Sequence, residues 1–93
     1  MNKVFTIGWA YQMRFNELPY GVTECRFSLK TKKMISKNKD NTEYDYIPCY
    51  VKGNKAVNMQ KNLSDGARIS MWSKMVLDDI GRLTLSVEEI DFL

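Results

Sequence analysis

The stretch that decides the fold is TEYDYIPCYVKGN, residues 42–54. In an extended strand, successive side chains point to opposite faces, so every second residue shares a face. One face then carries core residue types, and the other carries tyrosines followed by a lysine. The inward set is Ile47, Cys49 and Val51, and the outward set is Tyr44, Tyr46, Tyr50 and Lys52. The stretch therefore predicts a half-buried strand that presents aromatic rings beside a cation.

Pro48 interrupts this strand because proline has no N–H to donate to a neighbouring strand. The strand should therefore be a sheet edge at Pro48 or carry a bulge there. A bulge would change which of the tyrosines share a face, so both arrangements stay open from the sequence.

The same strand-like alternation recurs in other segments, separated by turn signals. The predicted strands are 2–13, 22–32, 42–52, 68–77 and a last one from Leu83, with turns at 18–21 and 78–81 and a polar loop at 33–41. Gly8 lies inside the first strand and indicates a bend or bulge. Asp78 and its neighbours read as a turn rather than as a pair of catalytic acids.

A short helix is predicted at residues 55–63, with Asn54 as its N-cap. Ala56, Met59 and Leu63 form one apolar stripe, which suits a helix that plugs the end of a barrel. Three strands, one helix and two strands is the element order of the OB fold, a five-stranded Greek-key barrel. We therefore expect an all-β OB fold, as a single domain over residues 1–93.

Composition argues against an enzyme. The chain has 93 residues, a net charge of +3, no histidine and two cysteines. It lacks a nucleotide-binding motif, a zinc-ligand set and clustered acids, so we expect no catalytic residue, no metal and no cofactor. Cys25 and Cys49 fall in apolar strand segments and should be buried, reduced thiols. No apolar run reaches membrane-spanning length, so we expect a cytoplasmic protein without a membrane partner.

Several segments resemble bacterial and phage single-stranded DNA-binding proteins of the SSB family. They are MNKVFTIG (1–8), RFSL (26–29), DYIPCYVKGNK (45–55), NLSDG (62–66) and VEEIDFL (87–93). The resemblance covers nearly the whole chain in order. It implies an OB-fold domain that self-associates and binds single strands without base specificity.

Three departures from the family pattern suggest a short, tail-less form. The chain stops at Leu93, where the family usually continues into a long tail that recruits other enzymes. The turn at 78–81 is short where the family has a long hairpin, so we expect a smaller footprint on DNA. Lys52 stands next to Gly53, where the family carries an aromatic residue. Such a form would suit a phage, plasmid or other mobile element, or a primosomal protein.

The resemblance also bears on individual residues. Tyr46 matches a stacking aromatic of the family, and the basic run that begins at Lys30 enters a loop that in the family wraps the nucleic acid. Trp72 should point outward, as a stacking platform or as an interface anchor, and Trp9 suits DNA contact and core packing equally. The candidate nucleic-acid-binding residues are Tyr46, Tyr50, Tyr44, Trp72, Lys52, Arg26, Lys30, Lys32, Lys33, Lys37, Trp9 and Lys74.

The expected function is sequence-independent binding of single-stranded DNA in replication, repair or mobile-element transfer. Aromatic stacking and contacts of Lys and Arg with phosphate would supply the affinity. The expected partners are single-stranded DNA, further copies of the chain in a dimer or tetramer, and a replication helicase or primase. The alternative is an OB-fold adaptor for a helicase or primosome, with tyrosines in a protein interface and weak DNA binding.

Overall fold

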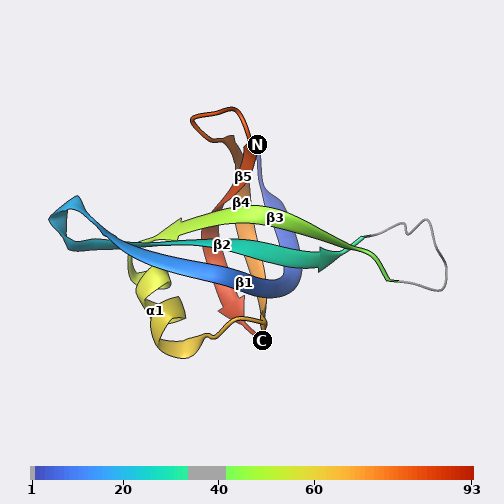
Figure 1. Cartoon of the computed structure of the whole chain (residues 1–93), viewed down its shortest axis with the longest axis horizontal. Helices are drawn as coiled ribbons and strands as arrows, with labels where there is room; N and C mark the ends of the chain where they lie inside the picture. The colour runs from blue at the N-terminus through green and yellow to red at the C-terminus, as the bar shows by residue number, and fades with distance from the viewer. Residues whose placement is uncertain (1, 34–41) are drawn as a thin grey trace.

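The computed structural model describes residues 2–33 and 42–93. The elements are β1 (Val4–Leu18), the 3-10 turn η1 (Pro19–Gly21), β2 (Val22–Lys32), β3 (Tyr44–Lys52), α1 (Asn54–Asn62), β4 (Ala67–Leu77) and β5 (Leu83–Phe92) (Figure 1). The strands close into a barrel in the order β1-β2-β3-β5-β4. The predicted OB fold, with one helix between the third and fourth strands, is confirmed.

β1 is long because it serves two neighbouring strands. Its first part, from Val4 to Ala10, pairs antiparallel with β4, and residues 9–18 pair antiparallel with β2. The strand predicted over 2–13 therefore continues to Leu18. A Cβ on Gly8 would lie 2.3 Å from the carbonyl oxygen of Lys30, so the glycine lets β1 pass close to the β2 backbone.

A bulge interrupts β1 farther along. The β1–β2 register shifts between Tyr11 and Arg14, and Gln12 adopts a left-handed backbone with φ of 55°. The backbone N–H of Met13 donates to Oδ1 of Asp65 at 3.3 Å. The bulge is thus tied to the turn that follows α1.

The alternation predicted for β3 is confirmed. Cys49 and Val51 are buried inside the barrel, Ile47 packs against the core, and Tyr46 is 62% exposed on the outside. Because β3 pairs with β2 from Tyr44 to Lys52 without a register shift, all of its outward residues share one face.

Pro48 lies opposite Ser28 in this continuous register, so the bulge interpretation is wrong and the edge interpretation is confirmed. The parallel pairing of β3 with β5 begins at Cys49, opposite Leu85. On the β5 side, Pro48 therefore lies just before the ladder begins, where its missing N–H costs no strand pairing.

The helix begins differently from the prediction. Gly53, and not Asn54, is the N-cap residue, and no side chain caps the helix. With φ of 84° and ψ of −150°, Gly53 adopts a conformation that only glycine enters readily, so the chain turns one residue early and Asn54 is already helical. Ala56 and Met59 are fully buried, as the apolar stripe predicts, and α1 covers one end of the barrel against β2 and β3 (Figure 1).

Both cysteines point into the core as free thiols, as predicted. Burial raises the pKa of Cys25 to about 11 and that of Cys49 to about 12. A thiol with so high a pKa stays protonated near neutral pH and is a poor nucleophile. The two cysteines are therefore packing residues.

The turn between β4 and β5 is built around Asp78, as predicted. Its Oδ1 accepts the backbone N–H groups of Ile80 at 3.1 Å and Arg82 at 2.8 Å, and its Oδ2 pairs with Nε of Arg82 at 3.1 Å. The hydrogen bond from the Arg82 backbone is the main cause of a lowered pKa at Asp78. The carboxylate is thus a structural anion of the turn.

Candidate nucleic-acid interface

The outward faces of β1, β2 and β3 meet at Lys30. This residue lies opposite Trp9 of β1 on one side and opposite Tyr46 of β3 on the other. Its Nζ is 4.2 Å from the ring centroid of Tyr44 and 5.7 Å from that of Tyr11. We call these five residues the Lys30 cluster: a lysine flanked by aromatic residues of β1 and β3, two of whose rings lie near its ammonium group.

Contacts among the aromatic residues fix the arrangement further. The rings of Trp9 and Tyr44 meet edge to face, with centroids 6.2 Å apart and an interplanar angle of 77°. The guanidinium carbon of Arg68, from β4, lies 5.7 Å from the Trp9 centroid. Cation–π and edge-to-face contacts of this kind hold partly exposed rings in place. Trp9 is therefore a half-buried surface residue rather than a core residue.

The backbone beneath the cluster is braced by two glycines. Gly8 allows the close approach of β1 to the Lys30 carbonyl. The N–H of Gly66 donates to the carbonyl of Ala10 at 2.7 Å, and a Cβ on Gly66 would lie 3.5 Å from the hydroxyl of Tyr11. The Tyr11 ring thus packs beside the turn that follows α1.

A second cation–aromatic pair lies on the same outward face, nearer the β1–β2 turn. The guanidinium carbon of Arg26 lies 4.8 Å from the Tyr50 ring centroid, and its Nε lies 3.8 Å from Glu24. The pKa of Tyr50 is raised by burial and then by a hydrogen bond to the Glu24 carboxylate. Glu24 is 8% exposed, so a nearly buried carboxylate contacts both side chains.

Two comparisons with known proteins agree with this geometry. Residues 1–89 match the Single-strand binding protein family. The chain belongs to this family. It is also similar in structure to the protein PriB from Ralstonia solanacearum, with a TM-score of 0.77 and 11% sequence identity over 99% of this chain and 97% of that one. At such low identity the likeness shows the shared fold. A search of curated proteins found no match.

In this single-strand binding family member, the other predicted cations lie around the same face. Lys32 pairs with Tyr44 across β2 and β3 and lines a hollow with Trp9 and Arg68. Lys52 lies at the opposite end of β3, across from Glu24. Both lysines are exposed, so both ammonium groups are available for a phosphate.

Lys33 is placed differently from the rest. Its Nζ lies 3.7 Å from Glu43 and 3.6 Å from Asp45, so two carboxylates compete with any phosphate. Lys37 falls outside the described residues, and its predicted role stays a prediction.

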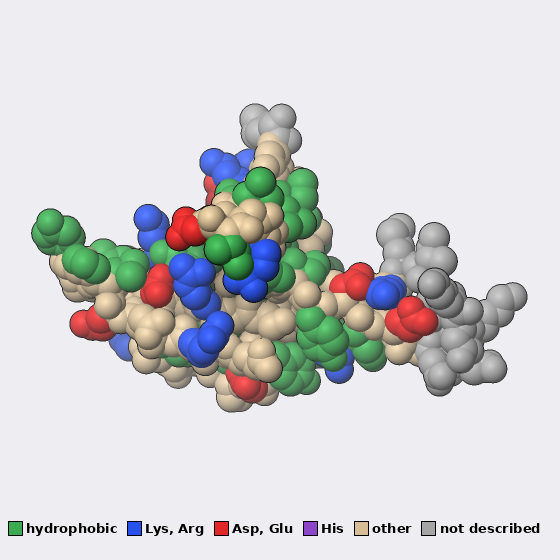
Figure 2. Space-filling model, turned by 45° about the horizontal axis from the view of Figure 1, so that its top comes forward, with side chains coloured by type: hydrophobic (Ala, Val, Ile, Leu, Met, Phe, Trp, Pro, Cys, Tyr) green, Lys and Arg blue, Asp and Glu red, His purple; other side chains and the backbone are tan. Residues whose placement is uncertain are grey.

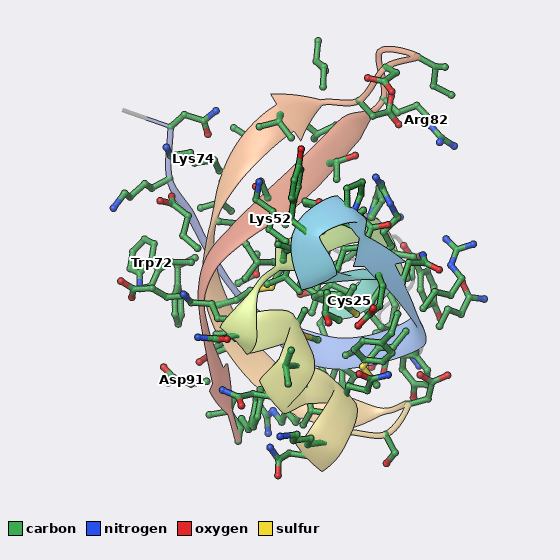
Figure 3. All side chains as sticks on the ribbon, turned by 90° about the vertical axis from the view of Figure 1, so that its left-hand side faces the viewer. Cys25, Lys52, Trp72, Lys74, Arg82 and Asp91 are labelled. Carbon is green, nitrogen blue, oxygen red and sulfur yellow. The ribbon has the colours of Figure 1, made fainter. Side chains whose placement is uncertain are left out.

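Trp72 and Lys74 lie on β4, and Figure 3 shows them to one side of the barrel, away from Lys52 of β3. Trp72 is 44% exposed and contacts Phe5, with ring centroids 5.0 Å apart. The neighbouring hollow is lined by Lys3 and by two acids, Glu88 and Glu89. The outward orientation predicted for Trp72 is confirmed, but it is separated from the Lys30 cluster, and the carboxylates disfavour a phosphate backbone beside it.

Three residues of the interface were not predicted. Tyr11 shares the face of Trp9 by strand alternation, and that signal could have identified it. Arg68 reaches Trp9 only through the pairing of β4 with β1. Gln12 lines a hollow beside Lys30 because of the bulge, which no sequence signal indicated.

Charge is mixed over the surface as a whole. Basic side chains are interspersed with hydrophobic and acidic ones on the face shown in Figure 2. Among the described residues, no group of three or more His, Cys, Asp or Glu side chains could hold a metal ion. Within the same part of the chain, no helix is long and apolar enough to cross a membrane.

Proposed function

We propose that this protein binds single-stranded DNA, with little overall sequence preference, across the outward faces of β1, β2 and β3. The observation that carries the proposal is the Lys30 cluster, where the ammonium group of Lys30 lies near the rings of Tyr44 and Tyr11 and the residue is flanked by Trp9 and Tyr46 in the strand pairing. Single-strand binding uses such rings as platforms for bases, each contributing about 1–3 kcal/mol, beside cations that follow the phosphates. Membership of the single-strand binding protein family supports the same ligand.

The two cation–aromatic sites define a track for the strand. Lys30 and Arg26 are four residues apart on β2, about 13 Å at 3.3 Å per residue. The strand would run from the end near Lys32, over the Lys30 cluster, to the pair of Arg26 and Tyr50. Lys52 extends the same face beyond that pair.

Trp72 fits the interface-anchor alternative better than the stacking alternative. Phe5 is exposed beside it on β1, at 49%, and Ile7, at 44%, lies between this pair and the hollow that Trp9 and Lys32 line. Exposed apolar groups that lie together commonly mark a protein interface. We therefore assign this face to self-association into a dimer or tetramer, which sedimentation of Trp72→Ala would test by a shift to smaller species.

The adaptor alternative also has an observation in its favour. On the β4–β5 hairpin, Leu77 is 71% exposed and Ile80 is 73% exposed. Ile80 also lines a hollow with Arg26 and Tyr50, so a helicase or primase bound to this apolar tip would lie beside the end of the DNA track. With either function, we propose that the protein is a single OB-fold domain. It would act in the cytoplasm during replication, repair or mobile-element transfer.

The binding proposal is tested by titrating oligo-dT at two salt concentrations. Replacing both Tyr44 and Tyr46 by alanine should weaken binding by about 2–6 kcal/mol, since each stacked base contributes about 1–3 kcal/mol. Tyr20→Ala is the matched control, because Tyr20 is a fully exposed tyrosine at the β1–β2 turn, outside the cluster. Lys32→Gln should reduce the salt slope by about 0.7, the value for one phosphate contact to a single strand. Unchanged affinity in a folded double variant would refute the stacking role.

A further inference from the structure

Gln12 is an unusual residue beside the Lys30 cluster. It is exposed and has φ of 55°, a left-handed conformation that costs a residue with a side chain about 1 kcal/mol or more. Glycine or asparagine would adopt this conformation more easily. A strained residue in a bulge is commonly placed there to aim a side chain.

The surroundings hold this bulge in a defined shape. Asp65 accepts the N–H of Met13, and Gly66 donates to the carbonyl of Ala10, so the turn after α1 is bonded on both sides of Gln12. The backbone at Gln12, from which the side chain projects, is therefore held by contacts from the rest of the fold.

Gln12 lines a hollow of about 460 Å³ in the middle of the proposed DNA track. The other lining residues are Tyr11, Ser28, Lys30 and Tyr46. Two aromatic rings thus share the hollow with an amide, a hydroxyl and an ammonium group. Rings alone would suffice for stacking on any base, whereas an amide and a hydroxyl add hydrogen-bonding groups that differ in their fit to different bases.

We propose that this hollow takes one nucleobase of the bound strand and that Gln12 reads its edge, with adenine preferred. The inference rests on the proposed function and adds a base preference at a single position. An amide presents one acceptor and two donors, which match N6–H and N7 of adenine side by side. The Ser28 hydroxyl, a donor and an acceptor, is available to a second group of the same base. The inference concerns this one position and leaves the rest of the track to the stacking and phosphate contacts of the proposed function.

The test uses the shortest oligo-dT that binds with full affinity. One dA is substituted at each position in turn, and the affinities are compared with those of the same oligonucleotides carrying 7-deaza-dA. The deaza base stacks in a similar way but lacks the N7 acceptor. We expect one dA position to bind at least about fivefold tighter than dT, and its deaza counterpart to lose that gain.

Gln12→Gly is the informative variant because glycine keeps the left-handed backbone and removes the amide side chain. It should abolish the gain from dA, so that the dA-substituted oligonucleotides and oligo-dT bind this variant with equal affinity. Gln60→Ala is the matched control, since Gln60 is an exposed glutamine on α1 that does not line the hollow.

The outcomes separate this inference from the proposed function. Equal binding of all dA-substituted oligonucleotides by the wild-type protein, with oligo-dT still bound, overturns the base preference alone. A dA gain that survives in Gln12→Gly, or in the deaza oligonucleotide, overturns the role of the amide. Absence of binding to every oligonucleotide overturns the proposed function, and this inference with it.

Discussion

Gly8→Ala should both destabilise the barrel and disturb the Lys30 cluster. The new Cβ would lie 2.3 Å from the Lys30 carbonyl oxygen, whereas an ordinary contact is 3.4 Å or longer, so a strand must move by about 1 Å. The atom in the way belongs to the β2 backbone, which cannot swing aside as a side chain does. Such overpacking costs about 1–3 kcal/mol.

Alanine also restrains the unfolded chain more than glycine does. This effect stabilises the folded state by about 0.5–1 kcal/mol and offsets part of the overpacking cost. The difference between the two effects is a loss of about 0–2.5 kcal/mol, with a central value of about 1 kcal/mol. For a chain of this size, each kcal/mol lowers Tm by about 4–8 °C, so thermal unfolding should show a fall of about that size and at most about 20 °C. Oligo-dT affinity should also fall, because the strand that moves carries Lys30.

Gly81→Ala is the control for glycine replacement without a clash. Gly81 has φ of 81° in the β4–β5 turn, and a Cβ there meets no atom within 4 Å. This variant should lose some stability through backbone strain but keep its DNA affinity. A Gly8→Ala protein as stable as wild type, with unchanged oligo-dT binding, would refute the reasoning.

Other predictions concern the core, the β1–β2 turn and the thiols. Met59→Ala should lower the free energy of unfolding in urea by about 2–5 kcal/mol, because Met59 is fully buried where α1 covers the barrel. Tyr20→Asn should raise it by up to about 1 kcal/mol, because Tyr20 has φ of 69° and asparagine enters the left-handed region more readily. The folded state binds the thiol protons of Cys25 and Cys49 more tightly than the unfolded state does, because burial raises both pKa values from 9.0. The resulting stabilisation is fully present below about pH 9.0 and should be lost as pH rises through about 11 and 12. Urea unfolding at increasing pH measures this loss, and both thiols should react with a thiol reagent at pH 8 only after unfolding.

The fold followed from the sequence because strand alternation is a local signal. The second strand was predicted with its observed bounds, Val22–Lys32, and the inward and outward sets of β3 were correct. The helix start was wrong at Asn54 because Gly53 turns the chain one residue earlier. A propensity for capping cannot by itself locate the residue where the backbone changes direction.

The site was harder to predict because it depends on strand pairing. Tyr44, Tyr46 and Lys30 were named as candidates, but their meeting with Trp9 and Tyr11 requires the register of β1 against β2. The separation of Trp72 from this cluster likewise follows from β4 and β5, which place Glu88 and Glu89 beside it. Neither the meeting of the cluster residues nor the position of Trp72 can be predicted from the spacing of residues within one strand.

The bulge at Gln12 also could not be predicted from the local sequence. Glutamine is a poor choice for a left-handed backbone, so the sequence around it reads as an uninterrupted strand. The bulge exists because Asp65 and Gly66, more than fifty residues away, bond to both sides of it.

The most direct test of the account is to ask which tryptophan senses DNA. Trp72→Phe leaves Trp9 as the reporter, and Trp9→Phe leaves Trp72. On titration with oligo-dT, the Trp72→Phe protein should show strong fluorescence quenching that weakens as salt rises, and the Trp9→Phe protein should show little. Quenching from Trp72 with none from Trp9 would place the strand on the β1–β4 face and contradict the central claim.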